Sequence, residues 1–206
     1  MSLQDIFFVL ILFSCLLVSI IKGFYWKHAK LLYMGVIAHR YSNQYLREEN
    51  AFVHRLNLIT FLLMIINFSL VLAKIYPAFG LNKVIMILAI LLIYYSAKKI
   101  IVVFLGKIFK QNDLAKLTMF FSILFDKTLA FIITPLVVIS HFFVFEITHI
   151  ILILILIITI LFLLLKTFWF FKIGRSSFGI SNFYIFLYLC IVEISPILLL
   201  KKGFFN

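Results

Sequence analysis

The stretch from Ile150 to Phe171 reads IILILILIITILFLLLKTFWFF, an almost unbroken run of isoleucine, leucine and phenylalanine. An α-helix rises about 1.5 Å per residue, so a run of this length crosses the roughly 30 Å hydrocarbon core of a bilayer. The run lacks the alternation of apolar and polar residues that marks a strand of a membrane β-barrel. It therefore predicts a membrane-spanning helix.

Five further apolar runs of comparable length extend the same prediction. The six spans are expected at about residues 6–26, 56–73, 84–105, 120–145, 150–171 and 182–200. Residues 1–5 contain no Lys or Arg, and no small-residue cleavage site ends the first run, so we interpret that run as a retained span. We expect an all-α fold, a polytopic transmembrane helical bundle with six spans that forms a single membrane domain over residues 1–206.

The composition supports this class of protein. Hydrophobic residues make up 66% of the chain and charged residues 13%, which is about half the share typical of a soluble domain. A net charge of +12 would suggest nucleic acid in a soluble protein, but no glycine-rich phosphate loop or aromatic-basic RNA motif occurs. Cys15 and Cys190 lie inside apolar runs and are too few for a zinc site. We expect the lipid bilayer as a partner, with no nucleic acid and no cofactor.

The basic residues predict the orientation of the chain. Fourteen Lys and Arg side chains lie after the first, third and fifth spans or within the second half of those spans, and four lie on the other side. The ones within the spans are Lys22, Lys98, Lys99 and Lys166. Because segments rich in Lys and Arg remain in the cytoplasm, this asymmetry places both termini on the non-cytoplasmic side. An even number of spans requires the two termini to share a side, so the two predictions agree.

Polar side chains spaced three or four residues apart follow the first span: Arg40, Asn43, Arg47, Asn50, His54 and Asn57. This spacing places them on one face of a helix. We expect a cytoplasmic interfacial amphipathic helix over about residues 27–55 that runs into the second span. Its polar stripe is either a docking surface for a partner or for anionic lipid headgroups, or the solvated face of an interfacial helix.

Charged residues flank the turn predicted between the third and fourth spans. Lys98 and Lys99 lie before the turn at residues 111–113, and Asp126 and Lys127 lie at a similar distance after it. In an antiparallel helix pair these positions are level. Charges at membrane depth are costly, and pairing offsets part of that cost. We therefore predict that Asp126 pairs with Lys98 or Lys99, as a structural ion pair or as a proton or ion relay, and Lys127 is a further ionisable candidate.

Glu193 lies near the centre of the sixth predicted span, with Tyr188 close by. An acidic residue there costs roughly 3 kcal/mol on the insertion scale. An intramembrane carboxylate is therefore a functional hypothesis. The alternative is a protonated or hydrogen-bonded glutamic acid that joins helices.

His141, Glu146 and His149 cluster where the fourth span ends and the fifth begins. Glu146 and His149 are three residues apart and share one helix face. Imidazole and carboxylate groups are suitable metal ligands, but a di-iron bundle needs two Glu-x-x-His pairs and only one occurs here. We interpret the cluster as an interfacial polar turn, with a metal site as the alternative.

The C-terminal part of the chain carries a Tyr-Leu-Cys-x-x-Glu-Ile-x-Pro motif, formed by Tyr188, Leu189, Cys190, Glu193, Ile194 and Pro196. With Arg47–Asn50 and the hairpin charges around Lys98 and Asp126, this motif resembles an uncharacterised family of small multi-spanning inner-membrane proteins from the Bacteroidota. The likeness covers about residues 40–202, and Ser195 stands where leucine is usual in that family. The resemblance implies a bacterial inner-membrane location and a cell-envelope context, and it implies no activity.

Neither a Gly-x-Ser-x-Gly elbow nor a His-Glu-x-x-His motif occurs. The first functional hypothesis is therefore a non-catalytic integral membrane subunit or assembly factor of an inner-membrane complex, with membrane-protein partners. The alternative is a small ion- or proton-coupled transporter that uses Glu193 and the Lys98/Asp126 cluster. An intramembrane enzyme acting on lipid ranks last, because few residues could supply a nucleophile together with a base.

Overall fold

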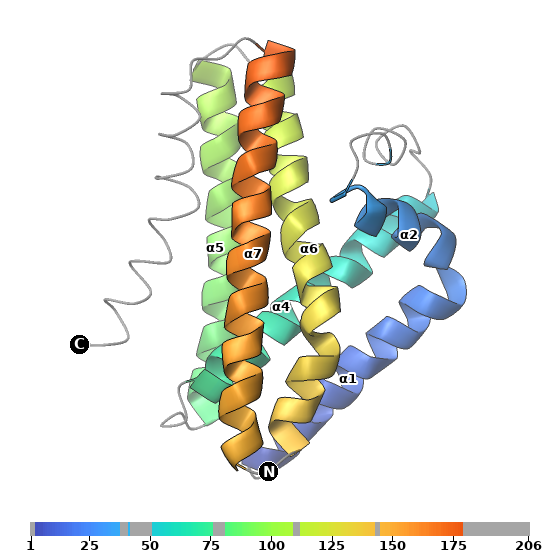
Figure 1. The fold of residues 1–206 in the computed structure, drawn as a ribbon, viewed down its shortest axis with the longest axis vertical. Coiled ribbons are helices and arrows are strands. Elements are labelled where there is room, and N and C mark those ends of the chain that lie inside the picture. The colour runs from blue at the N-terminus through green and yellow to red at the C-terminus, as the bar shows by residue number, and fades with distance from the viewer. Residues whose placement is uncertain are drawn as a thin grey trace, which may run out of the picture. The chain divides into compact units, whose positions relative to one another are not determined.

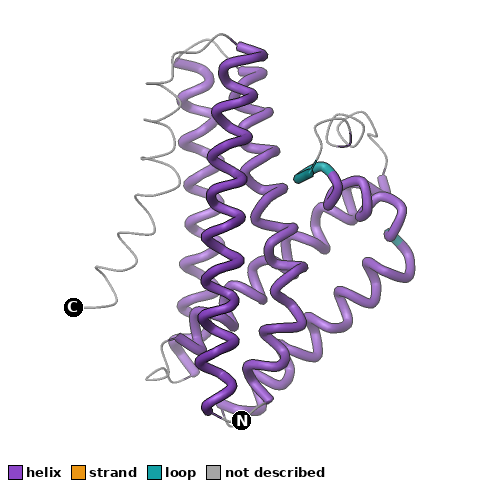
Figure 2. The backbone as a smooth tube through the Cα atoms, viewed as in Figure 1, coloured by secondary structure: helices purple, strands orange, loops and turns teal. Residues whose placement is uncertain are grey.

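The structure is a computed structural model, and it describes residues 3–37, 41, 51–75, 81–108, 112–142 and 145–178. All regular structure within these ranges is helical, as Figure 2 shows. The helices labelled in Figure 1 are α1 (Leu3–Phe24), α2 (Trp26–Met34), α4 (Ala51–Ile75), α5 (Leu81–Ile108), α6 (Asn112–Phe142) and α7 (Phe145–Phe178). The predicted all-helical fold is confirmed for this part of the chain.

Five of the described helices are long and apolar enough to cross a membrane. Their candidate spans are Asp5–Phe24, Ala51–Ile75, Val84–Phe104, Lys116–Phe142 and Thr148–Lys172. Each overlaps one of the first five predicted spans, so these apolar runs are confirmed as helices of membrane-spanning length. The sixth predicted span, residues 182–200, lies outside the described residues.

Helix α4 begins earlier than the predicted second span. It starts at Ala51, whereas the apolar run starts at Leu56. Backbone hydrogen bonds within a helix do not require apolar side chains, so the helix continues back through the polar residues His54 and Arg55. The apolar pattern marks the part of a helix that suits lipid, and it does not mark where the helix starts.

The single helix predicted over residues 27–55 is interrupted in the structure. Its first part is α2, which is separated from α1 at Tyr25, whose φ of −119° and ψ of 10° depart from helical values. Helix α2 ends at Met34, and the N–H of Val36 then donates to the carbonyl oxygen three residues earlier, which closes the end of the helix. Gly35 is a poor helix former, which explains why the helix stops here.

The chain divides into two compact units. Unit 1 comprises Met1–Leu91 and Ile123–Ile160, and unit 2 comprises Leu92–Ser122 and Leu161–Asn206. Unit 1 therefore holds α1, α2 and α4 with the first part of α5, the second part of α6 and the first part of α7. The single membrane domain expected over residues 1–206 stays a prediction.

In unit 1, α1, α2 and α4 pack with the second part of α6. The rings of Phe7 in α1 and His141 in α6 are 5.3 Å apart, which places the start of α1 beside the end of α6 (Figure 1). Tyr33 of α2 stacks on Phe131 of α6 with ring centroids 4.5 Å apart. The interior contains buried aliphatic side chains, among them Ile21, Leu56, Leu63, Met64, Leu70 and Ile133.

Unit 2 has an aromatic core of its own. Phe121 of α6 stacks on Trp169 of α7 with ring centroids 6.2 Å apart, and both side chains are buried. The ammonium of Lys172 lies 5.4 Å from the centre of the Trp169 ring, close enough for a cation–π interaction. These contacts hold the second part of α7 against the first part of α6.

Helix α7 exposes large apolar side chains along its length. The exposed residues include Ile153, Leu156, Ile157, Ile160, Leu161, Leu164 and Phe168. In water many exposed apolar side chains would drive association, whereas in a bilayer they contact lipid. The exposed apolar side chains of α7 are therefore those expected of a membrane protein.

Candidate functional site

Asn67 of α4 joins three helices of unit 1. Its Oδ1 accepts a hydrogen bond from Oγ of Ser14 in α1 at 2.8 Å. Its Nδ2 donates to the carbonyl oxygen of Ala130 at 2.9 Å and to Oγ1 of Thr134 at 2.8 Å, both in α6. All four residues are buried, and Asn67 is 0% exposed. We call Ser14, Asn67, Ala130 and Thr134 the Asn67 junction.

The Asn67 junction is electrically neutral. Amide and hydroxyl groups do not exchange protons readily near neutral pH, so the junction is unsuited to general acid–base catalysis. Both N–H donors of Asn67 are already engaged by α6. Hydrogen bonds are directional, so these bonds set the rotation of α1 and α6 against α4. The chemistry of the junction is that of a structural link.

A second link between α4 and α6 contains a cation. Lys127 of α6 is 6% exposed, and its Nζ donates to the backbone oxygen of Asn57 at 3.1 Å and to Asn57 Oδ1 at 2.9 Å. Within the part of the chain that the structure describes, these are the acceptors of the Lys127 ammonium. Both are neutral dipoles, so they solvate the charge without neutralising it. A cation inside a span is costly and marks a site where pairing or function is expected.

The two links show how α4 and α6 run. Asn57 precedes Asn67 along α4, and their partners Lys127 and Thr134 follow the same order along α6. The two helices therefore run in the same direction. At about 1.5 Å per residue, the links lie about 15 Å apart along α4 and about 10 Å apart along α6. Two links at different levels fix both the rotation and the axial register of this helix pair.

Several other buried hydroxyl groups of unit 1 bond within their own helices. Thr60, Ser69 and Thr128 each donate to a backbone carbonyl oxygen three or four residues earlier. In hydrocarbon, where water cannot satisfy a hydroxyl group, such bonding back to the helix removes the cost of burying it. These three side chains therefore satisfy themselves without linking helices.

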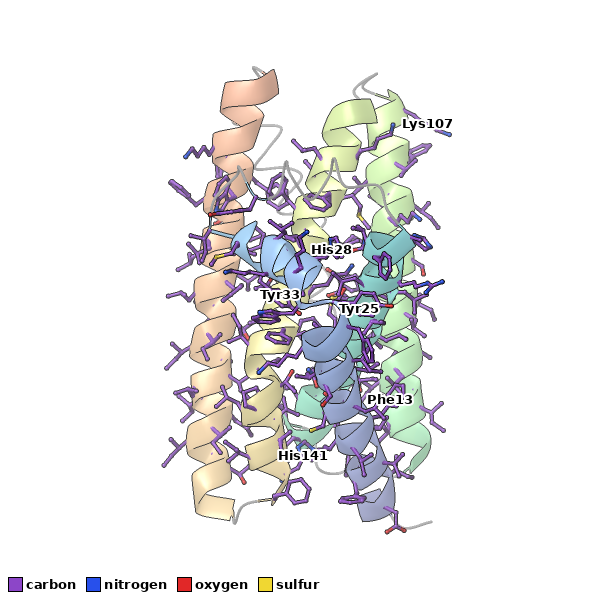
Figure 3. The ribbon with its side chains drawn as sticks, turned by 90° about the vertical axis from the view of Figure 1, so that its right-hand side faces the viewer. Phe13, Tyr25, His28, Tyr33, Lys107 and His141 are labelled. Atoms are coloured by element: carbon purple, nitrogen blue, oxygen red, sulfur yellow. The ribbon has the colours of Figure 1, made fainter. Side chains whose placement is uncertain are left out.

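His141 lies at the end of α6, near the start of α1 (Figure 3). Its Nδ1 is 3.0 Å from the carbonyl oxygen of Val137 and 3.3 Å from Oγ of Ser140. Its Nε2 is buried and has no hydrogen-bond partner among the described residues. The contact with Val137 holds the ring against its own helix and beside Phe7.

The metal candidate of His141, Glu146 and His149 is only partly visible. His149 is exposed, and the Glu146 side chain lies outside what the structure describes. Across the described side chains, no three His, Cys, Asp or Glu groups gather so as to hold a metal ion. The metal site stays a prediction.

The hairpin charges fall in different units. Lys98, in unit 2, is 2% exposed, and its ammonium lies 5.7 Å and 6.0 Å from the ring centres of Tyr94 and Tyr95. Lys99 is exposed, and Asp126, in unit 1, is half-buried. The pairing of Asp126 with either lysine stays a prediction, and the burial of Lys98 makes it the one of the two that lies at the protein interior.

Several predicted site residues lie outside the described part of the chain: Glu193, Tyr188, Arg40, Asn43, Arg47 and Asn50. Of the predicted polar stripe, His54 is exposed in α4 and Asn57 is half-buried against Lys127. Asn57 therefore faces the protein, whereas His54 faces outward. The docking role of the stripe stays a prediction.

The family described as "Domain of unknown function (DUF4271)" matches residues 7–204. The chain belongs to this family. The DUF4271 match runs from α1 through α7 and confirms the resemblance to an uncharacterised family, while the bacterial group and the C-terminal motif stay predictions. Comparisons with curated proteins and with solved structures found no match.

The residues of the Asn67 junction in this DUF4271 chain were not predicted from the sequence. Ser14, Asn67 and Thr134 lie inside apolar runs. A lone asparagine within a span is nevertheless a recognisable signal for a helix–helix hydrogen bond. Lys127 and Asn57 were both predicted site residues, but their hydrogen bond was not predicted, because it depends on α4 and α6 being neighbours.

Lys166 lies within the fifth predicted span, although its charge counts toward the segment that follows that span. The structure places it inside α7 with 2% of its surface exposed. A long side chain can lie along a helix toward an interface, so a lysine near a span's end is compatible with helical structure. The remaining basic residues still give the predicted charge asymmetry.

Proposed function

We propose that this DUF4271 chain is a non-catalytic integral membrane subunit or assembly factor of a bacterial inner-membrane or cell-envelope complex. The observation that carries the proposal is the Asn67 junction, in which neutral polar groups of three helices bind one another inside unit 1. A catalytic centre needs groups that bind and transform a substrate. In the Asn67 junction the donor groups bind other helices of the chain instead, as expected of a scaffold, that is, a non-catalytic structural subunit.

The outer surface of α7 supports the same proposal. Its exposed isoleucine, leucine and phenylalanine side chains are available to lipid and to the spans of other proteins. Spans associate through close packing of such surfaces together with occasional polar contacts. A subunit of a membrane complex needs a surface of this type.

The topology is part of the proposal. Five spans come from the helices of membrane-spanning length, and the sixth comes from the apolar run at residues 182–200. The Lys and Arg counts support both termini on the non-cytoplasmic side. In this arrangement α2 lies at the cytoplasmic interface, as the residual part of the predicted amphipathic helix.

The test is purification of the tagged full chain from native membranes after cross-linking within the membrane. We expect defined membrane proteins to co-purify in a constant ratio, and an unrelated multi-spanning protein with the same tag should not recover them. A chain that purifies alone in mild detergent, with no cross-linked partner from native membranes, would overturn the proposal.

A small ion- or proton-coupled transporter is the second candidate, and the buried cations favour it. Lys98 and Lys127 are 2% and 6% exposed within their helices. In this function Glu193 and the Lys98/Asp126 cluster would carry the coupled ion. If a Glu193→Gln variant took up the coupled ion as the parent chain does and showed no change in phenotype, the result would count against the transporter. The scaffold would then be the better explanation.

A further inference from the structure

Helix α2 has one cationic face and one buried face. Ala29 and Leu32 are buried, whereas Trp26, Lys27 and Lys30 are exposed. At 100° per residue the three exposed residues fall on one side of the helix and the two buried residues fall on the other. The helix therefore lies against the rest of unit 1 with its lysines directed away from the protein.

Aromatic contacts attach the start of α2 to the start of α4. The ring of Phe52 in α4 lies 6.2 Å from the ring of Tyr25 and 6.4 Å from the ring of His28, with which it is stacked at 12°. Arg55 follows Phe52 by three residues on the same face of α4 and is exposed. The contacts therefore place the start of α4, which carries Arg55, beside the start of α2, which carries Lys27.

This region lies at the boundary of the hydrocarbon. The α1 span is 20 residues long, which at about 1.5 Å per residue matches the roughly 30 Å hydrocarbon core. Because that span ends at Phe24, α2 begins at the level of the headgroups. Figure 3 shows Tyr25 and His28 at this end of α1 and His141 toward its opposite end. The exposed rings of Trp26 and Phe52 suit this depth, where aromatic side chains anchor to the interface.

We propose that Lys27, Lys30 and Arg55, flanked by Trp26 and Phe52, bind the phosphate of an anionic phospholipid headgroup. We call these five residues the α2–α4 basic face. Charge complementarity carries the choice of ligand: the described residues of α1, α2 and α4 contain one acidic side chain, Asp5, and it lies at the opposite end of α1.

A lipid fits this surface better than a soluble acidic partner does. The cations lie beside exposed rings at headgroup depth, so a ligand that contacts both must present a phosphate next to an apolar chain. Lysine supplies a point charge to a phosphate oxygen, and arginine supplies a planar group that can bind two of its oxygens. The binding site does not depend on whether the chain is a scaffold or a transporter.

The test uses the full chain, purified in a neutral detergent and titrated with phosphatidylglycerol or phosphatidylcholine, with bound lipid followed by native mass spectrometry. We expect phosphatidylglycerol to bind at least tenfold more tightly than phosphatidylcholine. Each Lys or Arg near a headgroup accounts for about a fivefold change in affinity, so Lys27→Gln/Lys30→Gln/Arg55→Gln should lose at least tenfold.

The matched control removes three exposed lysines elsewhere: Lys99→Gln/Lys107→Gln/Lys116→Gln. It changes the net charge equally and should alter affinity less than twofold. Equal losses in both triple variants, or none in the first, would overturn the proposal. Full competition by millimolar inorganic phosphate would also overturn it, because the site would then recognise free phosphate and not a lipid.

A variant that keeps every charge tests the placement of the cations. Phe52→Ala removes the ring that contacts Tyr25 and His28, and it should weaken phosphatidylglycerol binding about threefold or more if the basic face depends on this contact. If the triple variant does not fold, Lys30→Gln and Arg55→Gln are measured singly. Each must lose about fivefold, and unchanged affinity in both would refute the site.

Discussion

At the scale of single residues, Asn67 and Lys127 lie in a setting where water cannot bind them. Asn67 finds partners on α1 and α6, and Lys127 finds the backbone oxygen and the amide oxygen of Asn57. An unpaired polar group costs several kcal/mol in hydrocarbon, so polar side chains inside spans strongly favour the arrangements that pair them. A few such residues can therefore select one packing among many apolar ones.

Replacing Asn67 with leucine is expected to destabilise the chain by about 2 kcal/mol. The substitution nearly preserves side-chain volume and removes three hydrogen bonds between helices, each of which contributes about 0.6 kcal/mol on average in membrane proteins. The measurement is the free energy of unfolding in mixed micelles titrated with a denaturing detergent. Thr159→Val is the control, because the Thr159 hydroxyl bonds within its own helix, and it should change stability by less than about 0.5 kcal/mol. A variant as stable as the parent chain would contradict the junction.

The two partners of the Lys127 link should respond differently to substitution. Lys127→Met removes a buried charge and keeps an apolar side chain of similar length, so stability should change by no more than about 1 kcal/mol. Asn57→Leu leaves the ammonium with one acceptor fewer and should cost about 1.5 to 3 kcal/mol. The free energy of unfolding of both variants, measured under the same conditions, shows which substitution costs more. If Lys127→Met proves the more damaging, the cation itself stabilises the fold and the proposed order is wrong.

At the scale of elements, α1 shows which face of a nearly all-apolar helix points inward. Ile11, Ser14, Leu17 and Ile21 are buried at spacings of three or four residues, whereas Phe8, Leu12 and Leu16 are exposed. Both sets contain large apolar residues, so hydropathy does not distinguish the two faces. Small polar residues do not distinguish them either, because Ser14 is buried and Ser19 is exposed. The bond from Ser14 to Asn67 shows which face points inward.

Two serines of α1 give a matched test of this face. Ser14→Leu adds bulk at a buried position and removes the bond to Asn67, and it should cost about 1 to 3 kcal/mol. Ser19 is exposed and donates to the carbonyl oxygen of Cys15 in its own helix, so Ser19→Leu should stay within about 0.5 kcal/mol of the parent. Thermal unfolding in detergent compares the two variants. Equal destabilisation would mean that α1 packs through another face.

At the scale of the whole molecule, the number of spans decides the side on which the chain ends. With six spans and both termini outside the cytoplasm, an alkaline phosphatase fused after Asn206 should be active, because that enzyme needs a non-cytoplasmic location. The same enzyme fused after Lys172, where the fifth span ends, should be inactive, and a fluorescent protein fused there should fluoresce. Inactive phosphatase after Asn206 would contradict the six-span topology.

For the described part of the chain, the sequence alone determined that it is helical and where its five long apolar helices lie. It could do so because bilayer thickness sets the length of a span, and helical hydrogen bonds are local, so neither depends on neighbouring helices. Only the tertiary structure decided that Asn67 is bound by Ser14 and Thr134 and that Lys127 is bound by Asn57. Those partners come from different helices, and apolar runs of similar composition do not specify which helices become neighbours. The few polar side chains that bind one another between helices depend on which helices are neighbours. Their partners are therefore known only once α1, α4 and α6 are seen to be in contact.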